Sequence, residues 1–292
     1  MSTKEFKTVD EQIALLRNRG LSIPNEEQAK DFLFRNNYYR ISGYSLTLRS
    51  YDVFHKNATF QNIIDIYNFD YELRHILLQY LEIIEVAIKS VYSYEFTKRY
   101  GATGYLDSSH FTNEEKYNEI IDKAEKQKET RLPHEAYLKH FVEDLKEDIP
   151  LWAYVDLFTI SDISFLYSIS DSDVQQAVAD AFGLRHKGAA LLGRFMKSMT
   201  IIRNLCAHGS RLYNRLFEQK PCLNNQEKQL LLVDEDGLVD NAHLFSFILI
   251  MRRLLKPEEF ASMKADIVSL TQKYTFVNMC YYGFRSDWEN IL

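Results

Sequence analysis

The feature that most constrains the fold is a long run of apolar residues at helical spacing between Phe60 and Arg99. The large side chains that recur there every three or four residues are Ile63, Ile66, Tyr67, Leu73, Leu77, Leu81, Ile84 and Ile88. This spacing places them on one face of a helix, so the segment predicts a core helix, or two helices that break near Asn68. The low content of glycine (10) and proline (5) in 292 residues also favours long helices. We therefore expect an all-α protein.

The rest of the chain also shows helical patterns. Two short helices are expected near the start, one over 9–19 that ends at Gly20 and one that Asn25 caps and that reaches about Asn37. The segment Tyr38–Ser50 predicts an irregular or briefly extended connector, and Thr59 is expected to cap the long helix. Further helices are predicted over 151–169, 173–182, 186–217, 224–233, 241–255 and 257–274.

This organisation favours two units, an N-terminal helical extension over residues 1–55 and one helical domain over residues 56–292. Within the domain, residues 113–148 are rich in opposite charges four positions apart, such as Glu119 and Lys123. Such pairs stabilise solvated helices. We expect this segment to be a charged helical insertion that protrudes from the body.

The strongest functional signal is the stretch IIRNLCAHGSRLYNR, which ends at Arg215. It places Arg203, Asn204 and His208 within one and a half turns of a predicted helix. An arginine can grip two phosphate oxygens, and an imidazole can move a proton near neutral pH. We take Arg203, His208 and Asn204 as candidate catalytic residues that act on a phosphodiester.

Three further polar residues follow this group, and we assign them to RNA or phosphate binding: Arg211, Asn214 and Arg215. If the helix continues, Asn204, His208, Arg211 and Arg215 lie within roughly 60° of one another on one face. A neighbouring apolar stripe of Ile201, Leu205, Leu212 and Leu216 would then face the core. Gly209 is a weak point, and a looser helix there would turn His208 outward.

Net charge alone argues against an RNA-binding protein, because the whole chain carries −6. The charge is unevenly distributed, however. Residues 184–220 contain eight lysines and arginines and one acid, Glu218, so this segment carries +7 and the rest carries −13. A basic stripe on an acidic body can attract nucleic acid locally. The same stripe could instead pair with acidic helices of its own fold, and a lone histidine is often structural.

Charged residues inside the long apolar helix need partners. Asp70 and Arg74 are spaced to form an i,i+4 pair. Glu82 and Glu85 are supporting candidates, because either could form a salt bridge with Arg203 or Arg211 and aim it at a substrate. The two glutamates lack a histidine at i+3, which argues against a metal site.

Other features narrow the range of functions. Tyr38, Tyr39 and Tyr44 with Arg40 could stack on unpaired bases, but we favour packing in a chain this rich in tyrosine. The three cysteines show no CxxC spacing, which argues against disulfides and zinc. Phosphate-binding glycine loops and a nucleophile elbow are lacking, so no cofactor or metal is expected. The chain shows neither a signal core nor a membrane span, and we expect a cytoplasmic protein.

At this point the sequence resembles the Abi family of abortive-infection proteins, of the AbiD/AbiF type, within the HEPN superfamily. The resemblance extends over nearly the whole chain. It rests on an opening KTVDEQIALLRNRGLSIPNEEQAKDFLFRNNYYRISGY, a middle signature FDYELRHILLQYLEIIEVAIKS, the RNLCAHGSRLYNR stretch and a Gly283-Phe284…Trp288 ending. The Pro150-Leu151-Trp152 segment also matches, although Thr159–Asp162 replaces the family's glycine-bearing turn.

The resemblance implies an all-α, HEPN-like helical bundle and metal-independent RNA cleavage in anti-phage defence. Arg203 and His208 match the family's R-x4-H pair, and Asn204 matches the polar residue next to the arginine. It also implies a homodimer with a shared site, and an effector restrained by an antitoxin RNA or protein. Some HEPN proteins bind nucleic acid without cutting it, so a non-catalytic RNA-binding or regulatory module is the alternative. A third alternative is an interaction protein whose polar helix docks on an acidic partner.

Overall fold

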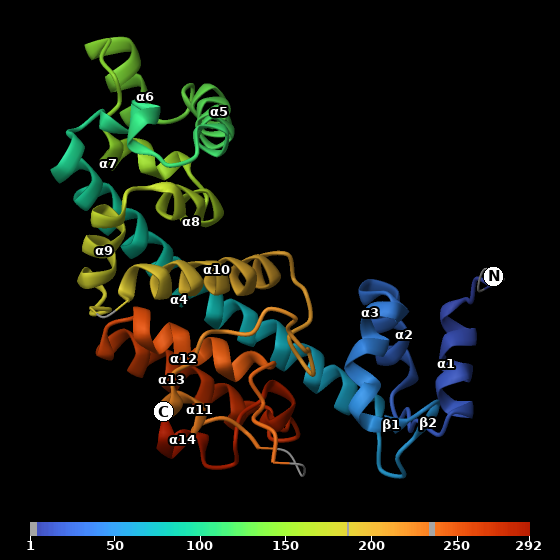
Figure 1. Ribbon diagram of the computed structural model, residues 1–292. Helices are drawn as coiled ribbons and strands as arrows, with labels where there is room; N and C mark the ends of the chain where they lie inside the picture. Colours follow the sequence, from blue (N-terminus) through green and yellow to red (C-terminus); the bar gives the residue numbers. More distant parts are fainter. Residues whose placement is uncertain (1–4, 186, 234–236) are drawn as a thin grey trace.

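The computed structural model describes residues 5–185, 187–233 and 237–292, and its fold is all-α, as predicted. The axis of the molecule is α4 (Phe60–Tyr100), a helix of 41 residues that runs diagonally through the fold (Figure 1). Thr59 and Asn62 cap its start reciprocally, and Gly101, at φ +81°, ends it. The helix continues without a break through Asn68. On either side of that residue, Tyr67 packs on Phe32 of the N-terminal part and Phe69 packs on Tyr274 of the C-terminal part.

The predicted apolar face of α4 forms the centre of the core. The side chains of Leu73, Leu77, Leu81, Ile84 and Ile88 are fully buried. The helices that pack on α4 include α9 (Ser172–Ala181), α10 (Gly188–Ala207), α12 (Leu244–Leu254) and α13 (Pro257–Lys273). Truncation of such a core side chain to alanine typically costs about 2–5 kcal/mol of stability. The core therefore keeps α4 and α10 in contact.

An N-terminal unit, residues 5–58, lies at the start of α4 (Figure 1). Its elements are α1 (Val9–Asn18), α2 (Glu26–Asn36), α3 (Tyr38–Ser42), the 3-10 turn η1 (Gly43–Leu48), β1 (Arg49–Ser50) and β2 (Val53–Phe54). The two strands form an antiparallel hairpin with Arg49 opposite Phe54. The prediction of an irregular connector over 38–50 is wrong for its first part. Asn37 starts a new helix there, because its side chain accepts a hydrogen bond from the Tyr39 N–H.

The far end of α4 carries a region over residues 104–169, which contains the charged segment 113–148 that was expected to protrude. Its elements are η2 (Gly104–Leu106), η3 (Ser108–His110), α5 (Glu114–Arg131), α6 (Ala136–Lys139), the π-helical turn η4 (His140–Leu145), α7 (Leu151–Tyr154), η5 (Val155–Leu157) and α8 (Ile160–Ile169). One face of α5 is solvated and carries the Glu119–Lys123 ion pair. The opposite face buries Tyr117 and Ile120 and packs towards α8. The charged segment is thus an amphipathic layer on the body.

The C-terminal part completes the bundle with α11 (Asn225–Lys228), η6 (Met279–Tyr282) and α14 (Trp288–Ile291). The helix predicted over 224–233 is only one turn long. The helix predicted over 186–217 is also shorter, since α10 ends at Ala207, and residue 186 lies outside the described part of the chain. No helix among the described residues has the length and apolar character needed to cross a membrane.

Candidate functional site

The predicted site residues lie at the C-terminal end of α10. Arg203 and Asn204 occupy its last turns, and His208 is the capping residue, with its N–H donated to the Asn204 carbonyl at 3.0 Å. Gly209 follows at φ +63°, a left-handed conformation that glycine adopts without strain. The helix therefore stops here, and the side chain of His208 is exposed, as a looser helix at Gly209 predicted.

The residues after His208 form a loop, which we call the motif loop (residues 208–217), and this corrects the prediction of one polar helical face. Arg211, Asn214 and Arg215 do not continue the stripe of Asn204 and His208, because Gly209 and Asn214 both have positive φ angles. The predicted apolar stripe ends for the same reason. Leu212 is buried, but Leu216 is 69% exposed.

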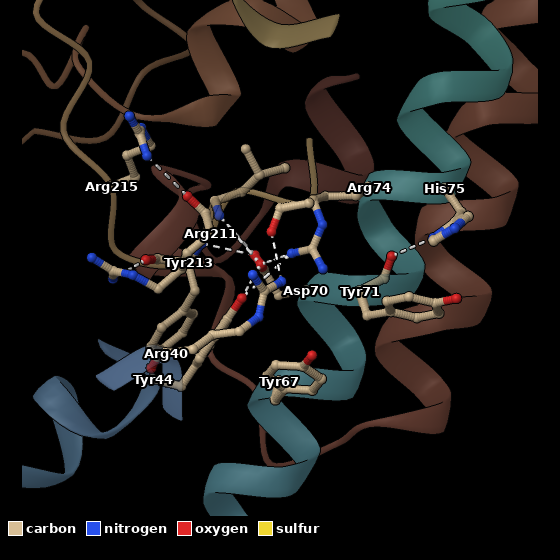
Figure 2. A network of polar contacts seen from close by, with 12 residues as sticks. Arg40, Tyr44, Tyr67, Asp70, Tyr71, Arg74, His75, Arg211, Tyr213 and Arg215 are labelled. Carbon is tan, nitrogen blue, oxygen red and sulfur yellow. Dashed lines mark hydrogen bonds and ion pairs between the residues drawn. The ribbon is translucent and has the colours of Figure 1, made fainter. Parts of the chain in front are cut away.

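A buried carboxylate on α4 determines the path of the motif loop (Figure 2). Asp70 is fully buried, and its oxygens accept the backbone N–H groups of Leu212, at 3.2 Å, and Tyr213, at 2.8 Å. These N–H groups would otherwise lie in the core without partners, which is costly. The oxygens of Asp70 thus accept two backbone N–H groups that have no helical carbonyl partner, because the helix ends at Ala207.

The other donors to Asp70 complete a closed network. Arg74 forms the predicted i,i+4 ion pair with Asp70, and the hydroxyls of Tyr44 and Tyr282 donate to its carboxylate at 2.8 and 3.0 Å. Burial raises the pKa of Asp70, while the charge of Arg74 and the hydrogen bonds from Tyr44 and Tyr282 act in the opposite direction. Burial also raises the pKa of both tyrosines, so their hydroxyls remain donors.

Sequence reasoning identified the Asp70–Arg74 pair but not its contact with the motif loop. The available signal was the position of Asp70 on the buried face of a core helix. Arg74 alone cannot donate to all the lone pairs of this carboxylate, so further donors had to come from elsewhere. Backbone N–H groups 142 and 143 residues away provide the missing donors. Such a distant pairing is visible only in the folded chain.

Arg203 is held by a glutamate of α4. Its Nε lies 3.6 Å from Glu85 Oε2, and its Nη1 donates to Asn204 Oδ1 at 3.4 Å. This confirms the predicted salt bridge between one of the two glutamates and Arg203. Glu85 also pairs with Lys89, at 3.0 Å. Glu82 is exposed and forms no ion pair with any residue that the structure describes.

A groove opens next to the end of α10. It has a volume of about 530 Å³, and its polar lining includes Asn204, His208, Ser210, Arg215 and Glu218. Leu216 and Phe217 contribute an apolar wall. The His208 imidazole, the Asn204 amide and the Arg215 guanidinium therefore line one accessible groove. Such a lining suits an anionic ligand with apolar parts. The fold brings Arg215 to this groove, despite the break in the helix.

Arg203 and Arg211 are placed differently. Neither lines the groove, although Asn204, which does, is bonded to Arg203. Arg211 donates to the carbonyls of Tyr213 and Asn214, so its guanidinium supports the motif loop from within. The Asn214 N–H is donated to the Tyr281 carbonyl at 2.9 Å, which fastens the loop to the C-terminal part.

The N-terminal unit also contacts the motif loop. Arg40 Nη2 donates to the Gly209 carbonyl at 2.6 Å, and the Thr47 and Tyr213 hydroxyls lie 2.6 Å apart. Gly43 faces Arg211, where an added Cβ would lie 3.1 Å from Arg211 Nε. Tyr44 is buried in the Asp70 network, as the packing interpretation predicted, whereas Tyr39 is exposed. The predicted extension is therefore part of the site's architecture.

Comparison with known families agrees with the resemblance seen in the sequence. A family model described as "Abi-like protein" matches residues 31–214, which is more than half of the chain. The match begins within α2, includes all of α4 and α10, and ends inside the motif loop. Comparison with curated proteins and with solved structures finds no significant match.

Proposed function

The chain belongs to the Abi-like protein family, and on this premise we propose that it is a metal-independent endoribonuclease of the HEPN type that acts in abortive infection. The observation that carries this proposal is the shared groove of Asn204, His208 and Arg215 at the end of α10. These side chains combine proton transfer with phosphate binding. Arg203 precedes Asn204 on α10 and is bonded to it, although Arg203 itself does not line the groove.

The proposed chemistry uses the nucleophile that RNA itself carries. A base takes the proton of a ribose 2′-OH, the 2′-oxygen forms a bond to phosphorus, and the bond from phosphorus to the 5′-oxygen breaks. An acid protonates the leaving 5′-oxygen, so the products are a 2′,3′-cyclic phosphate and a 5′-OH. In this scheme His208 transfers a proton and Arg203 offers a planar fork to the phosphate oxygens.

The surrounding residues have supporting roles in the proposal. Glu85 limits the freedom of Arg203, so less entropy is lost when the guanidinium binds a phosphate. Asn204 connects Arg203 to the groove of His208. Arg215 adds a positive charge for the RNA backbone, while Arg211 and Asn214 shape the motif loop that carries it.

We further propose that two chains form a homodimer. Transesterification needs both a base and an acid, but the motif supplies a single histidine per chain. A two-fold axis near the groove would bring two copies of Arg203 and His208 into one site. A purified protein that is strictly monomeric at micromolar concentration and still cuts RNA would contradict this arrangement.

The deciding experiment is cleavage of end-labelled RNA in EDTA, with analysis of the product ends. The wild type is expected to yield cyclic-phosphate ends and the His208→Ala variant none. His134→Ala is a matched control, because it removes another exposed histidine far along the chain from the motif. Retained cleavage in His208→Ala would exclude His208 from the chemistry.

A non-catalytic RNA-binding module is the second candidate, and one observation favours it. Among the residues that the structure describes, no side chain hydrogen-bonds to the His208 imidazole and orients it. General acids and bases usually have such a partner. If the wild type binds RNA, never cuts it and retains its affinity in His208→Ala, the binding module replaces the enzyme.

A further inference from the structure

We infer that Arg40, from the N-terminal unit, is an additional contact for an RNA backbone phosphate at the mouth of the His208 groove. This inference rests on the proposed function, because it assumes that RNA is the ligand of the groove. It extends the binding surface to α3, outside the RNLCAHGSRLYNR stretch. The argument starts from the charge partners of the arginines in the N-terminal unit.

Arg40 differs from the four other arginines of this unit in having no acidic partner. The ion pairs of those arginines are Arg17–Glu26, Arg19–Asp52, Arg35–Asp31 and Arg49–Asp52. Arg40 forms no ion pair with any carboxylate in the part of the chain that the structure describes. Its positive charge is therefore available to an anion from outside.

The position of Arg40 directs this charge towards the candidate site. Its Nη2 donates to the carbonyl of Gly209, the residue directly after His208, at 2.6 Å. Its guanidinium carbon lies 5.6 Å from the centre of the Tyr67 ring, a cation–π contact that supports the side chain from α4. The guanidinium is thus fixed next to His208 and Ser210, which both line the groove.

The N–H groups of Arg40 that do not bond to Gly209 are suited to bind a phosphate. A guanidinium has five N–H groups in one plane, and the Gly209 carbonyl occupies one of them. Arg40 is exposed, so the free edge of the guanidinium can meet solvent or an anion. Arg211 and Arg215, on the motif loop, also have no carboxylate partner among the described residues. Arg40 therefore adds a positive charge from another element to the charges of Arg211 and Arg215. The groove beside them has one acid, Glu218, among the described residues that line it.

A purely structural role would use only the hydrogen bond to Gly209. Arg40→Gln separates the two roles, because glutamine can still donate to a carbonyl but carries no charge. The matched control is Arg35→Gln, which removes an exposed arginine of the same unit that already has an acidic partner. Each change is made in the His208→Ala background and in EDTA, so that the RNA stays intact during binding.

The measurement is the affinity for a mixed-sequence single-stranded RNA over a range of salt concentrations. Each phosphate contact contributes about 0.7 to the slope of log K against log salt for a single strand. We expect Arg40→Gln to weaken binding and to reduce this slope by about 0.7. Arg35→Gln should leave both quantities unchanged.

Two results would overturn the inference while leaving the proposed function in place. One is an unchanged affinity in Arg40→Gln. The other is a weaker affinity with an unchanged slope, which would indicate that Arg40 only holds the motif loop in place through its hydrogen bond to Gly209. If the parent protein binds no RNA and the wild type cuts none, the proposed function itself fails, and the role of Arg40 fails with it. Circular dichroism of Arg40→Gln checks that the helices are intact.

Discussion

The carboxylate of Asp70, in the first half of α4, accepts the backbone N–H of Tyr213 at 2.8 Å, although the two residues are 143 positions apart. This bond and its neighbour at Leu212 hold the motif loop against the core helix. The path of the motif loop after His208 is therefore determined by Asp70, a residue that never reaches the surface. A buried acid on one helix thus shapes the groove at the end of another.

Replacement of Asp70 by asparagine should strongly destabilise the protein. Asparagine presents an amide NH2 to a site built for a carboxylate, and it leaves the buried Arg74 without a counter-charge. Loss of one partner of a buried ion pair typically costs about 3–5 kcal/mol. Urea unfolding would measure the change in the free energy of unfolding. The same substitution at Asp65, which bonds to Gln61 on the outside of α4, should cost no more than about 0.5 kcal/mol.

Two glycines near the motif should respond in opposite directions to alanine. Gly209→Ala is expected to cost about 1–2 kcal/mol, because alanine is strained at φ +63°. Gly193→Ala, inside α10, should stabilise the protein by about 0.5–1 kcal/mol, because an added Cβ there meets only ordinary contacts with Tyr167. Chemical denaturation of both variants checks the prediction, and equal effects would contradict the helix end described at His208.

Loss of the acidic partner of Arg203 should affect catalysis more than stability. We expect Glu85→Gln to lower RNA cleavage about tenfold, because Arg203 would lose its orienting charge. The free energy of unfolding should change by less than about 1 kcal/mol, because glutamine can still accept hydrogen bonds from Arg203 and from Lys89, the second cation that pairs with Glu85. Glu95→Gln is the matched control. It breaks an ion pair with Lys98 on the same helix, far from the groove, and should leave cleavage unchanged.

Arg203→Lys tests the phosphate fork directly. Lysine keeps the positive charge but cannot donate two parallel hydrogen bonds to one phosphate. We expect cleavage to fall about a hundredfold or more, measured as the initial rate on end-labelled RNA in EDTA. Near-normal cleavage would show that only the charge of Arg203 matters.

Cys206 should report on the opening of α10. Burial raises the pKa of its thiol to about 12, so at pH 8 almost no thiolate is present for alkylation. We expect iodoacetamide to modify the half-buried Cys222 in the native protein and to reach Cys206 only after unfolding. Mass spectrometry of the peptides, with and without urea, measures this order. Modification of Cys206 in the native protein would show that the end of α10 opens locally.

The sequence by itself determined the helical class, the buried face of α4, the caps at Asn25 and Thr59 and the exposure of His208 next to Gly209. These features depend on local spacing and capping, which a short stretch of chain encodes. Only the tertiary structure decided that the polar stripe ends at His208 and that Arg40 meets Gly209. The reason is that a buried carboxylate satisfies backbone donors from a distant segment. The stability that these hydrogen bonds contribute depends on their burial in the folded protein. No local sequence pattern predicts which distant segments will be in contact there.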